Sequence, residues 1–377
     1  MTTGLDRVAL GFCPALRGMR VALLANHTAV DAWGRHAVQV LTAAGAHIVR
    51  LIGPEHGVWG THQDMEPVAA GAPGAELDPI WQLPVVSLYG ADRASLEPRP
   101  EALAGVDAIV FDVRDVGVRY YTYGATLALT MKAAAALGVP VWVLDRPNPI
   151  GPRREGPLLR AGFESFCGLV PGLPIRHGLT IGQLARWYAA RVAPTVQLTV
   201  VASDKYGQTP WVPPSPNMPT RDTAVVYAGM CLLEGTTVSE GRGTTTPFLS
   251  FGVPGANPVA LVDRLRGRDC PGVDYVPTRF RPAFGKHAGA IVDGVYLRVF
   301  DATSVPAVRL GVYVLEALRA LAPERWTWRT APYEFVTDVP AIDLLWGSDA
   351  LRKTLDAGGD VDALLEAADA ECKTFAP

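Results

Sequence analysis

The sequence predicts an α/β protein with a doubly wound, Rossmann-like and mostly parallel sheet, followed by a second, smaller α+β C-terminal domain. Two observations support the sheet: short apolar runs alternate with segments of helical periodicity over residues 19–202, and polar residues follow each apolar run. A third supports the second domain. The chain has 377 residues, of which 49% are hydrophobic, and this exceeds one ordinary core.

The alternation starts with an apolar strand at residues 19–26, a helix at 34–44 and a second strand at 46–52. The pattern continues with strand 83–88, helix 95–104, strand 108–113, helix 125–137, strand 139–144, helix 180–191 with Thr180 as its N-cap, and strand 195–202. Such alternation predicts a parallel sheet with helices on both faces. We expect this first domain to span residues 1–252.

The pattern changes after residue 252. We expect helix 258–266, strands 274–284 and 290–300, and helices 308–321, 341–346 and 350–368. Residues 253–377 are therefore predicted to form the smaller α+β domain, with a boundary placed to within ~10 residues.

Composition excludes several classes of partner. The formal net charge is −3 and no basic field is present, so nucleic acid is not expected as a ligand. No segment has ~18 consecutive apolar residues, and the first residues do not resemble a signal peptide. The sequence as written thus predicts a cytoplasmic protein without a membrane partner, or an exported one if the true start lies upstream. The oligomeric state stays open.

Polar residues follow all five of the first predicted strands. They are Asn26 and Thr28, Glu55 and His56, Ser87 and Tyr89, Asp112 and Asp115, and Asp145, Arg146 and Asn148. The carboxyl ends of parallel strands meet at one edge of the sheet, where open α/β sheets place their chemistry. We therefore expect these five groups to share one crevice.

Glu55 and His56 form the most suggestive of these groups. The apolar strand at 46–52 stops at Gly53-Pro54, and a carboxylate beside an imidazole is a credible proton-transfer pair. The alternative is an ordinary strand-to-loop turn with a solvated Glu55.

Several common site signatures are absent from the sequence. It has no G-x-G-x-x-G after a strand, no G-x-x-x-x-G-K-[ST], no H-E-x-x-H and no G-x-S-x-G. The histidines show no metal-ligand spacing, and no cysteine lies beside an imidazole. We therefore expect no cofactor and no catalytic metal.

Carboxylate chemistry is what remains. Glycoside hydrolysis uses one carboxylic acid to protonate the leaving oxygen, and a second carboxylate or the substrate's own acetamido group to meet the developing positive charge. Glu55 is the candidate acid, and Asp112 or Asp115 is the candidate partner. The alternative for the pair is structural: Asp115 caps the turn, and Asp112 pairs with Arg114 or Arg119.

Aromatic and cationic side chains accompany these carboxylates. Rings that would stack on a sugar are Trp59, Tyr89, Tyr120, Tyr121 and Tyr123, although each is also a common core residue. Guanidinium groups that would clamp a substrate carboxylate are those of Arg119, Arg176 and Arg242.

Longer motifs resemble a known family. They are Asn26-x-Thr28, Gly53-Pro-Glu-His-Gly57, Ser87-Leu-Tyr-Gly90, residues 111–123 (F-D-V-R-D-V-G-V-R-Y-Y-T-Y), 144–150 (L-D-R-P-N-P-I), 176–180 (R-H-G-L-T), 214–219 (P-S-P-N-M-P) and 234–248. In this order they resemble the NamZ-type exo-β-N-acetylmuramidases, formerly catalogued as YbbC-like proteins. The resemblance implies a Rossmann-like domain, a smaller C-terminal domain and an active site in the cleft between them. It also implies hydrolytic release of N-acetylmuramic acid from the non-reducing end of peptidoglycan fragments.

The resemblance also assigns roles residue by residue. Glu55 falls on the glutamate of the Gly-Pro-Glu-His-Gly motif and is the expected general acid, with His56 and Asp115 as further catalytic candidates. The expected substrate-binding residues are Asn26, Thr28, Tyr89, Arg119, Tyr121, Tyr123, Arg176, His177, Asn217, Glu240 and Arg242. Residues 61–66 (T-H-Q-D-M-E) depart from the family pattern, which puts the neighbouring subsite in doubt.

Two other functions remain open at this point. A non-catalytic sensor of peptidoglycan fragments would bind the sugar and leave the bond intact. An amidase acting on the lactyl-peptide link is disfavoured because neither a metal site nor a nucleophile is evident.

Overall fold

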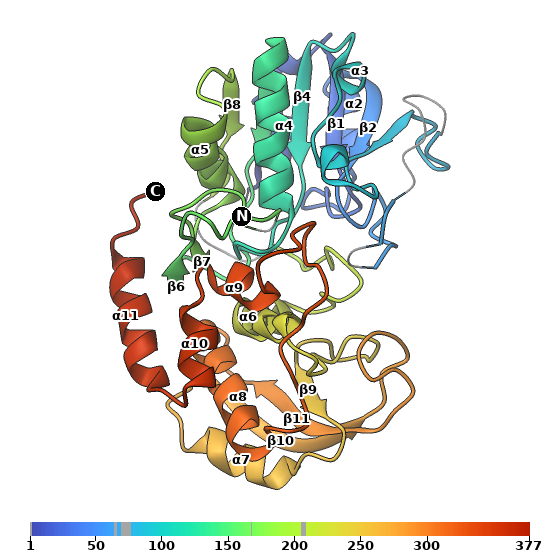
Figure 1. The fold of residues 1–377 in the computed structure, drawn as a ribbon. Coiled ribbons are helices and arrows are strands. Elements are labelled where there is room, and N and C mark those ends of the chain that lie inside the picture. The colour runs from blue at the N-terminus through green and yellow to red at the C-terminus, as the bar shows by residue number, and fades with distance from the viewer. Residues whose placement is uncertain (1, 64–65, 69–76, 167, 205–208) are drawn as a thin grey trace.

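The computed structural model describes residues 2–63, 66–68, 77–166, 168–204 and 209–377. Two domains follow one another along the chain, with the N-terminal domain uppermost in Figure 1. None of the helices within the described residues is long and apolar enough to cross a membrane.

The N-terminal domain is built on a six-stranded sheet of order β3-β2-β1-β4-β5-β8, in which every neighbouring pair is parallel. The strands are β1 (Arg20–Ala25), β2 (His47–Gly53), β3 (Val85–Ser87), β4 (Ala108–Asp112), β5 (Val141–Leu144) and β8 (Leu198–Val201). Central strands such as β4 are buried along their whole length, which explains their continuous apolar sequence. The predicted doubly wound sheet is confirmed.

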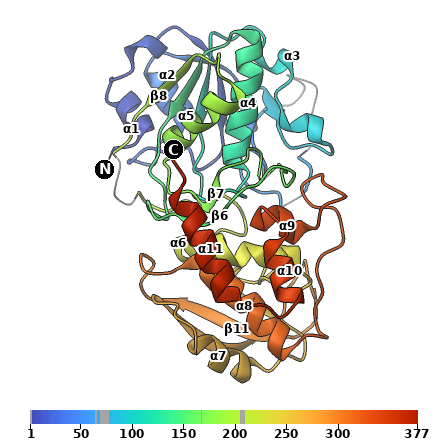
Figure 2. The same cartoon turned by 60° about the vertical axis from the view of Figure 1, so that its left-hand side comes forward.

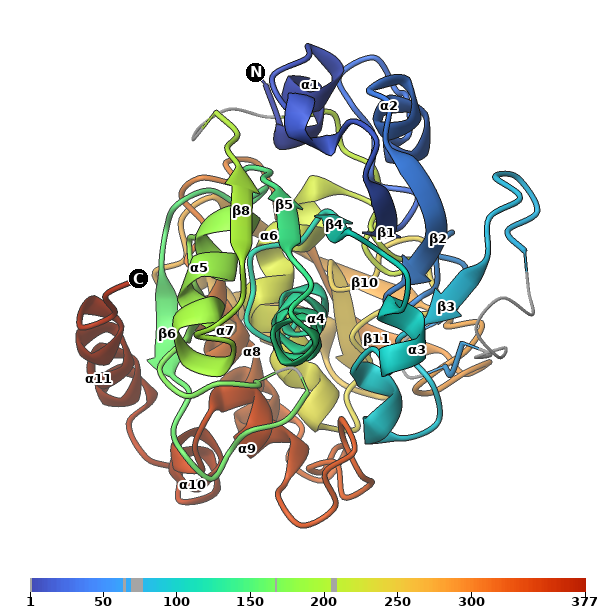
Figure 3. The same ribbon diagram turned by 90° about the horizontal axis from the view of Figure 1, so that it is seen from above.

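Helices cover both faces of this sheet (Figure 3). One face carries α1 (Gly4–Ala9) and α2 (Ala37–Ala43), and the other carries α3 (Pro100–Leu103), α4 (Tyr123–Leu137) and α5 (Ile181–Val192). The predicted cap of α5 is confirmed, because the Thr180 side chain accepts from the backbone of Gln183. In addition, β6 (Glu155–Leu158) and β7 (Pro174–Arg176) form a two-stranded antiparallel sheet.

The second domain packs helices against a three-stranded antiparallel sheet of order β10-β11-β9. Its elements are α6 (Arg221–Met230), β9 (Ser250–Val253), α7 (Pro258–Arg266), β10 (Val273–Phe280), β11 (Val292–Val299), α8 (Ala307–Leu321), α9 (Ala341–Trp346), α10 (Ala350–Asp356) and α11 (Val361–Lys373). Helices α6 and α8 cross at Gly229 and Gly311, where an added Cβ would meet backbone atoms of the other helix within 2.5 Å. Figure 2 shows α11 running back towards the first domain, beside β6 and β7.

Two details differ from the sequence prediction. The helix expected at 350–368 is two helices, α10 and α11, because Gly358 adopts a φ of +62° between them. The expected boundary at residue 252 falls inside β9, which pairs with β11 of the smaller sheet. We therefore propose a boundary ahead of α6. Strands β6, β7 and β9 and helices α1 and α6 were not predicted.

Candidate active site

The turn after β2 fixes the position of Glu55. The amide of Gly57 donates to the Pro54 carbonyl at 3.0 Å, and both His56 and Gly57 have positive φ angles, of +68° and +77°. The His56 ring is held by a 2.8 Å hydrogen bond between its Nδ1 and the His62 carbonyl. Glu55 is 5% exposed, so the alternative of a solvated glutamate on a surface turn does not describe this residue.

The start of α4 orients the Glu55 carboxylate. Thr122 is the N-cap residue of α4, but its hydroxyl makes no capping bond. It donates instead to Glu55 Oε2 at 2.7 Å. The ends of β2 and β4 thus meet through Glu55 and the loop that leads into α4, at the edge predicted for the site.

Glu55 lines a small cavity of about 40 Å³ to which both domains contribute. The first domain supplies Glu55, His56, Tyr120, Tyr121 and Thr122, and the following segment supplies Ser215, Asn217 and Met218. The second domain supplies Tyr227, Glu234, Arg242, Phe248, Tyr333 and Glu334. Five predicted residues are therefore brought together with Glu55: His56, Tyr120, Tyr121, Asn217 and Arg242.

An ionic network forms the second-domain side of the cavity. Arg242 Nη1 lies 3.0 Å from Glu234 Oε1 and 3.5 Å from Glu240 Oε1. Glu240 is behind the cavity and also pairs with Lys286 Nζ at 2.8 Å. Burial raises the pKa of Glu240, but the charges of Lys286 and Arg242 outweigh it and hold this pKa below the usual value. Arg242 therefore faces the cavity with its positive charge balanced by Glu234 and Glu240.

Tyr121 lies near two predicted carboxylates, those of Glu55 and Asp115. Burial raises the pKa of its hydroxyl, and the negative charges of Glu55 and Asp115 raise this pKa further. The ring makes an edge contact with Tyr123 at a centroid distance of 4.9 Å. Tyr121 thus stays a neutral hydroxyl donor beside Glu55.

Asp115 and His177 form a buried pair that does not line the cavity. Asp115 Oδ2 accepts from the Gly117 amide at 2.7 Å, which is the turn-capping contact weighed as the alternative, and lies 3.8 Å from His177 Nε2. His177 Nδ1 accepts from the Leu179 amide, so Nε2 carries the proton of the neutral ring. Burial raises the pKa of Asp115 to about 7 and lowers that of His177 to about 3.

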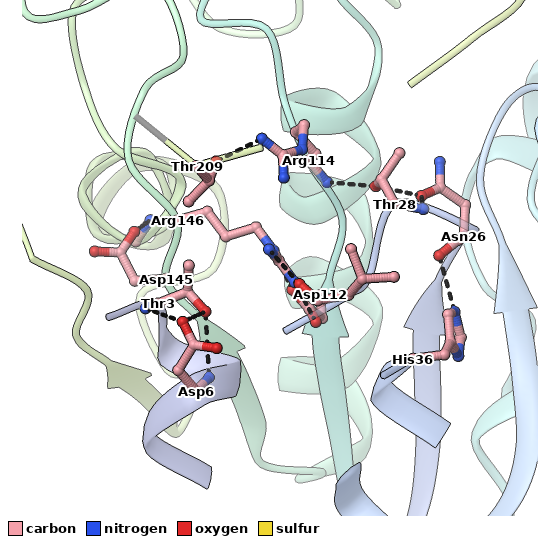
Figure 4. Close-up of polar contacts among 12 residues, drawn as sticks. Thr3, Asp6, Asn26, Thr28, His36, Asp112, Arg114, Asp145, Arg146 and Thr209 are labelled. Atoms are coloured by element: carbon pink, nitrogen blue, oxygen red, sulfur yellow. Dashed lines mark hydrogen bonds and ion pairs between the residues drawn. The ribbon is translucent and has the colours of Figure 1, made fainter. Parts of the chain in front are cut away.

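Asn26, Thr28 and Tyr123 form a network behind the site. The Asn26 Oδ1 accepts from the amide and hydroxyl of Thr28, and its Nδ2 donates to the Tyr123 hydroxyl at 3.1 Å (Figure 4 shows Asn26 and Thr28). Tyr123 in turn donates to the Pro214 carbonyl at 2.7 Å. These three residues hold the loop that carries Ser215 and Asn217.

Asp112 pairs with Arg146, which donates to both carboxylate oxygens at 2.6 and 2.9 Å (Figure 4). The expected pairing with Arg114 or Arg119 is wrong, because the side chain of Arg114 turns to the Thr209 hydroxyl. Asp112 is fully buried in this ion pair.

Two of the three predicted arginines lie elsewhere. Arg119 donates to four backbone carbonyls, those of Pro157, Leu173, Leu345 and Trp346, and so ties the two domains together. Arg176 pairs with Glu155 at 2.7 Å and also donates to the Ile150 carbonyl. The ring of Tyr89 is likewise absent from the cavity lining and packs against Phe166 and Phe335.

Sequence reasoning missed several residues of the cavity. Four of them, Thr122, Ser215, Glu234 and Phe248, lie inside the motifs that resemble the family, so their position in those motifs could have identified them. Nothing in the sequence marked Tyr333 and Glu334. Of the divergent segment 61–66, residues 64 and 65 lie outside the described residues, and Gln63 accepts from Asn217 at 2.9 Å. Among the residues described, no group of three or more His, Cys, Asp or Glu side chains converges as a metal site.

Fold and cavity together define a two-domain α/β protein with a carboxylate-lined cavity between its domains. The family models for the N- and C-terminal domains of the exo-beta-N-acetylmuramidase NamZ match residues 21–222 and 225–377. The chain therefore belongs to the NamZ family of exo-β-N-acetylmuramidases.

Individual proteins support this assignment. The chain is 36% identical to the peptidoglycan beta-N-acetylmuramidase NamZ of Bacillus subtilis (strain 168), over 99% of this chain and 88% of that relative. Two crystal structures of DUF1343 family proteins from Bacteroides fragilis NCTC 9343 have the same fold, with TM-scores of 0.85 and 0.76 and identities of 28% and 26%. Each of these comparisons covers 99% of this chain and 96% of the other.

Proposed function

We propose that Glu55 is the general acid with which this glycoside hydrolase releases N-acetylmuramic acid from peptidoglycan. The observation that carries the proposal is the buried Glu55 carboxylate, oriented by Thr122 within a cavity lined by both domains. A general acid must be held in a fixed orientation towards the leaving oxygen, and the hydrogen bond from Thr122 supports this role because it restrains the Glu55 carboxylate.

The other cavity residues suit a sugar ring with an acidic substituent. The rings of Tyr121, Tyr227 and Phe248 present apolar faces, and the two tyrosines add hydroxyl groups, as carbohydrate binding requires. Muramic acid carries a lactyl carboxylate, and Arg242 is the one predicted arginine that lines the cavity. We propose that Arg242 binds this carboxylate. We also propose that the sugar bound in the cavity is the residue at the non-reducing end of a peptidoglycan fragment.

Hydrolysis of a chromogenic N-acetylmuramide tests the role of Glu55. We expect Glu55→Gln to lower kcat by ~10²- to 10⁴-fold, the usual contribution of a general acid. Glu366→Gln, an exposed change on α11, is the matched control and should leave kcat unchanged. Undiminished turnover by Glu55→Gln would remove Glu55 from this role.

A sensor that binds peptidoglycan fragments without cleaving them is the competing function. The comparisons give it no support, since the family models and the Bacillus subtilis relative are named as muramidases. Mass spectrometry of the reaction mixture separates the two, because only an enzyme yields free N-acetylmuramic acid.

A further inference from the structure

The second domain places an acidic side chain in the same cavity as Glu55. Glu334 lines this cavity and is 5% exposed. It lies in the segment between α8 and α9 and reaches the cavity from the second domain. Carboxylates are rarely buried without a structural or chemical reason.

The backbone at Glu334 is held in an unusual conformation. Glu334 and Phe335 have φ angles of +51° and +64°, in the left-handed region that residues with a Cβ seldom adopt. Tyr333 and Val336 flank these two residues and form two backbone hydrogen bonds with each other. The Tyr333 amide donates to the Val336 carbonyl at 3.0 Å, and the Val336 amide donates to the Tyr333 carbonyl at 2.9 Å. Such strain persists only where the surroundings impose it, and it is concentrated at active sites.

Both neighbours of Glu334 are anchored. The Tyr333 hydroxyl donates to Glu234 Oε2 at 2.8 Å, and Glu234 pairs with Arg242. The Phe335 ring packs against Tyr89 of the first domain, with centroids 6.3 Å apart. The turn is thus fixed to both domains, and Glu334 is positioned in advance at the cavity wall.

We propose that Glu334 is the second catalytic carboxylate, the base that activates the attacking water. The inference rests on the proposed role of Glu55. Water forms the new bond to the anomeric carbon and gives a proton to Glu334, while the bond to the leaving oxygen breaks and that oxygen takes a proton from Glu55. Asp115, the partner expected from the sequence, does not line the cavity, whereas Glu334 does.

Leaving-group dependence distinguishes the two carboxylates. We expect both Glu55→Gln and Glu334→Gln to lower kcat by ~10²- to 10⁴-fold on an aryl N-acetylmuramide with a poor leaving group. A dinitrophenyl N-acetylmuramide has a good leaving group and needs no acid. On this substrate kcat of Glu55→Gln should return towards the wild-type value, whereas kcat of Glu334→Gln should stay low. Added azide or formate should restore turnover by Glu334→Ala, because a small anion replaces the missing base. A merely misfolded variant would not respond.

The control is Glu324→Gln, an exposed change in the same inter-helix segment, which should match the wild type on both substrates. Single displacement by water also predicts inversion, so proton NMR should detect the α anomer of the sugar first. Wild-type turnover by Glu334→Gln, recovery of this variant on the dinitrophenyl substrate, or retained anomeric configuration would overturn the inference while leaving Glu55 in place. Failure of the wild-type protein to cleave either substrate would overturn the proposed function itself.

Discussion

At the scale of single residues, the hydrogen bond between Thr122 and Glu55 is the contact on which the proposed acid role of Glu55 depends most directly. A hydrogen bond to a charged group contributes ~1.5–3 kcal/mol. Thr122→Val keeps the shape and removes the donor, so we expect kcat to fall roughly 10- to 100-fold. Thr122→Ser retains the hydroxyl and should stay near the wild-type kcat. Equal rates for the two variants would show that this bond does not orient the acid.

Arg242 is the residue proposed to bind the lactyl carboxylate of N-acetylmuramic acid. Lysine keeps the charge but loses the planar, bidentate donor set, so Arg242→Lys should weaken this contact. We expect kcat/KM for an aryl N-acetylmuramide to fall about tenfold further than that for the N-acetylglucosaminide, equivalent to ~1.4 kcal/mol. The glucosaminide lacks the carboxylate and is the internal control. Equal losses on the two substrates would assign Arg242 to the Glu234 and Glu240 network alone.

Residue type predicted some of these positions and not others. Glu55 was predictable because an apolar strand that stops at Gly53-Pro54 must project the next residue beyond the sheet edge. Arg119 and Arg176 were expected at the substrate because a guanidinium suits a carboxylate. It suits buried carbonyls and a buried glutamate equally well, and only tertiary packing decides between them.

At the scale of elements, the loop after β4 and the end of β7 bring Asp115 and His177 together with opposite effects on stability. Between pH 3.8 and about 7 the folded state binds more protons at Asp115 than the unfolded state, so the free energy of unfolding falls as pH rises. Between about pH 3 and 6.5 the unfolded state binds more protons at His177, so the free energy of unfolding rises with pH.

The two slopes, each of ~1.4 kcal/mol per pH unit, oppose one another from about pH 4 to 6.5. In Asp115→Asn only the His177 contribution to the pH dependence of stability remains, so the Tm of this variant relative to the wild type should rise with pH. His177→Asn, which preserves an acceptor for the Leu179 amide, should leave the Asp115 slope, so that relative Tm falls with pH. Thermal unfolding of all three proteins over this range measures both trends. Parallel curves would show that neither group titrates as its burial requires.

Element types were predictable where periodicity was long and ends were marked. Thr180 marked the start of α5, and the alternation of strands and helices predicted the sheet. Helix α6 was missed because it begins directly after the proline-rich segment 210–220, which has no helical periodicity. The turn that carries Glu334 was unpredictable because its importance arises from contacts with Glu234 and Tyr89, both distant in sequence.

At the scale of the whole molecule, the cavity that both domains line is smaller than a sugar ring. A volume of about 40 Å³ admits a water molecule, whereas ligand pockets usually measure ~300–1,000 Å³. We therefore expect the two domains to move apart when the substrate enters and to close again around it.

Hydrogen–deuterium exchange with and without saturating N-acetylmuramic acid tests this two-sided closure. Because both domains line the cavity, the ligand should slow exchange at residues 54–57 of the first domain and at 333–336 of the second. Helix α7, remote from the cavity, should exchange equally in both conditions. Protection confined to the first domain would contradict an active site shared between the domains.

The most direct test of the account is the hydrolysis of two isomeric disaccharides, one with N-acetylmuramic acid and one with N-acetylglucosamine at the non-reducing end. The wild-type protein should release free N-acetylmuramic acid from the first far faster than it cleaves the second, and Glu55→Gln should cleave neither at an appreciable rate. If the wild-type protein leaves the first disaccharide intact, or cleaves both equally, the chain is not the exo-acting muramidase described above.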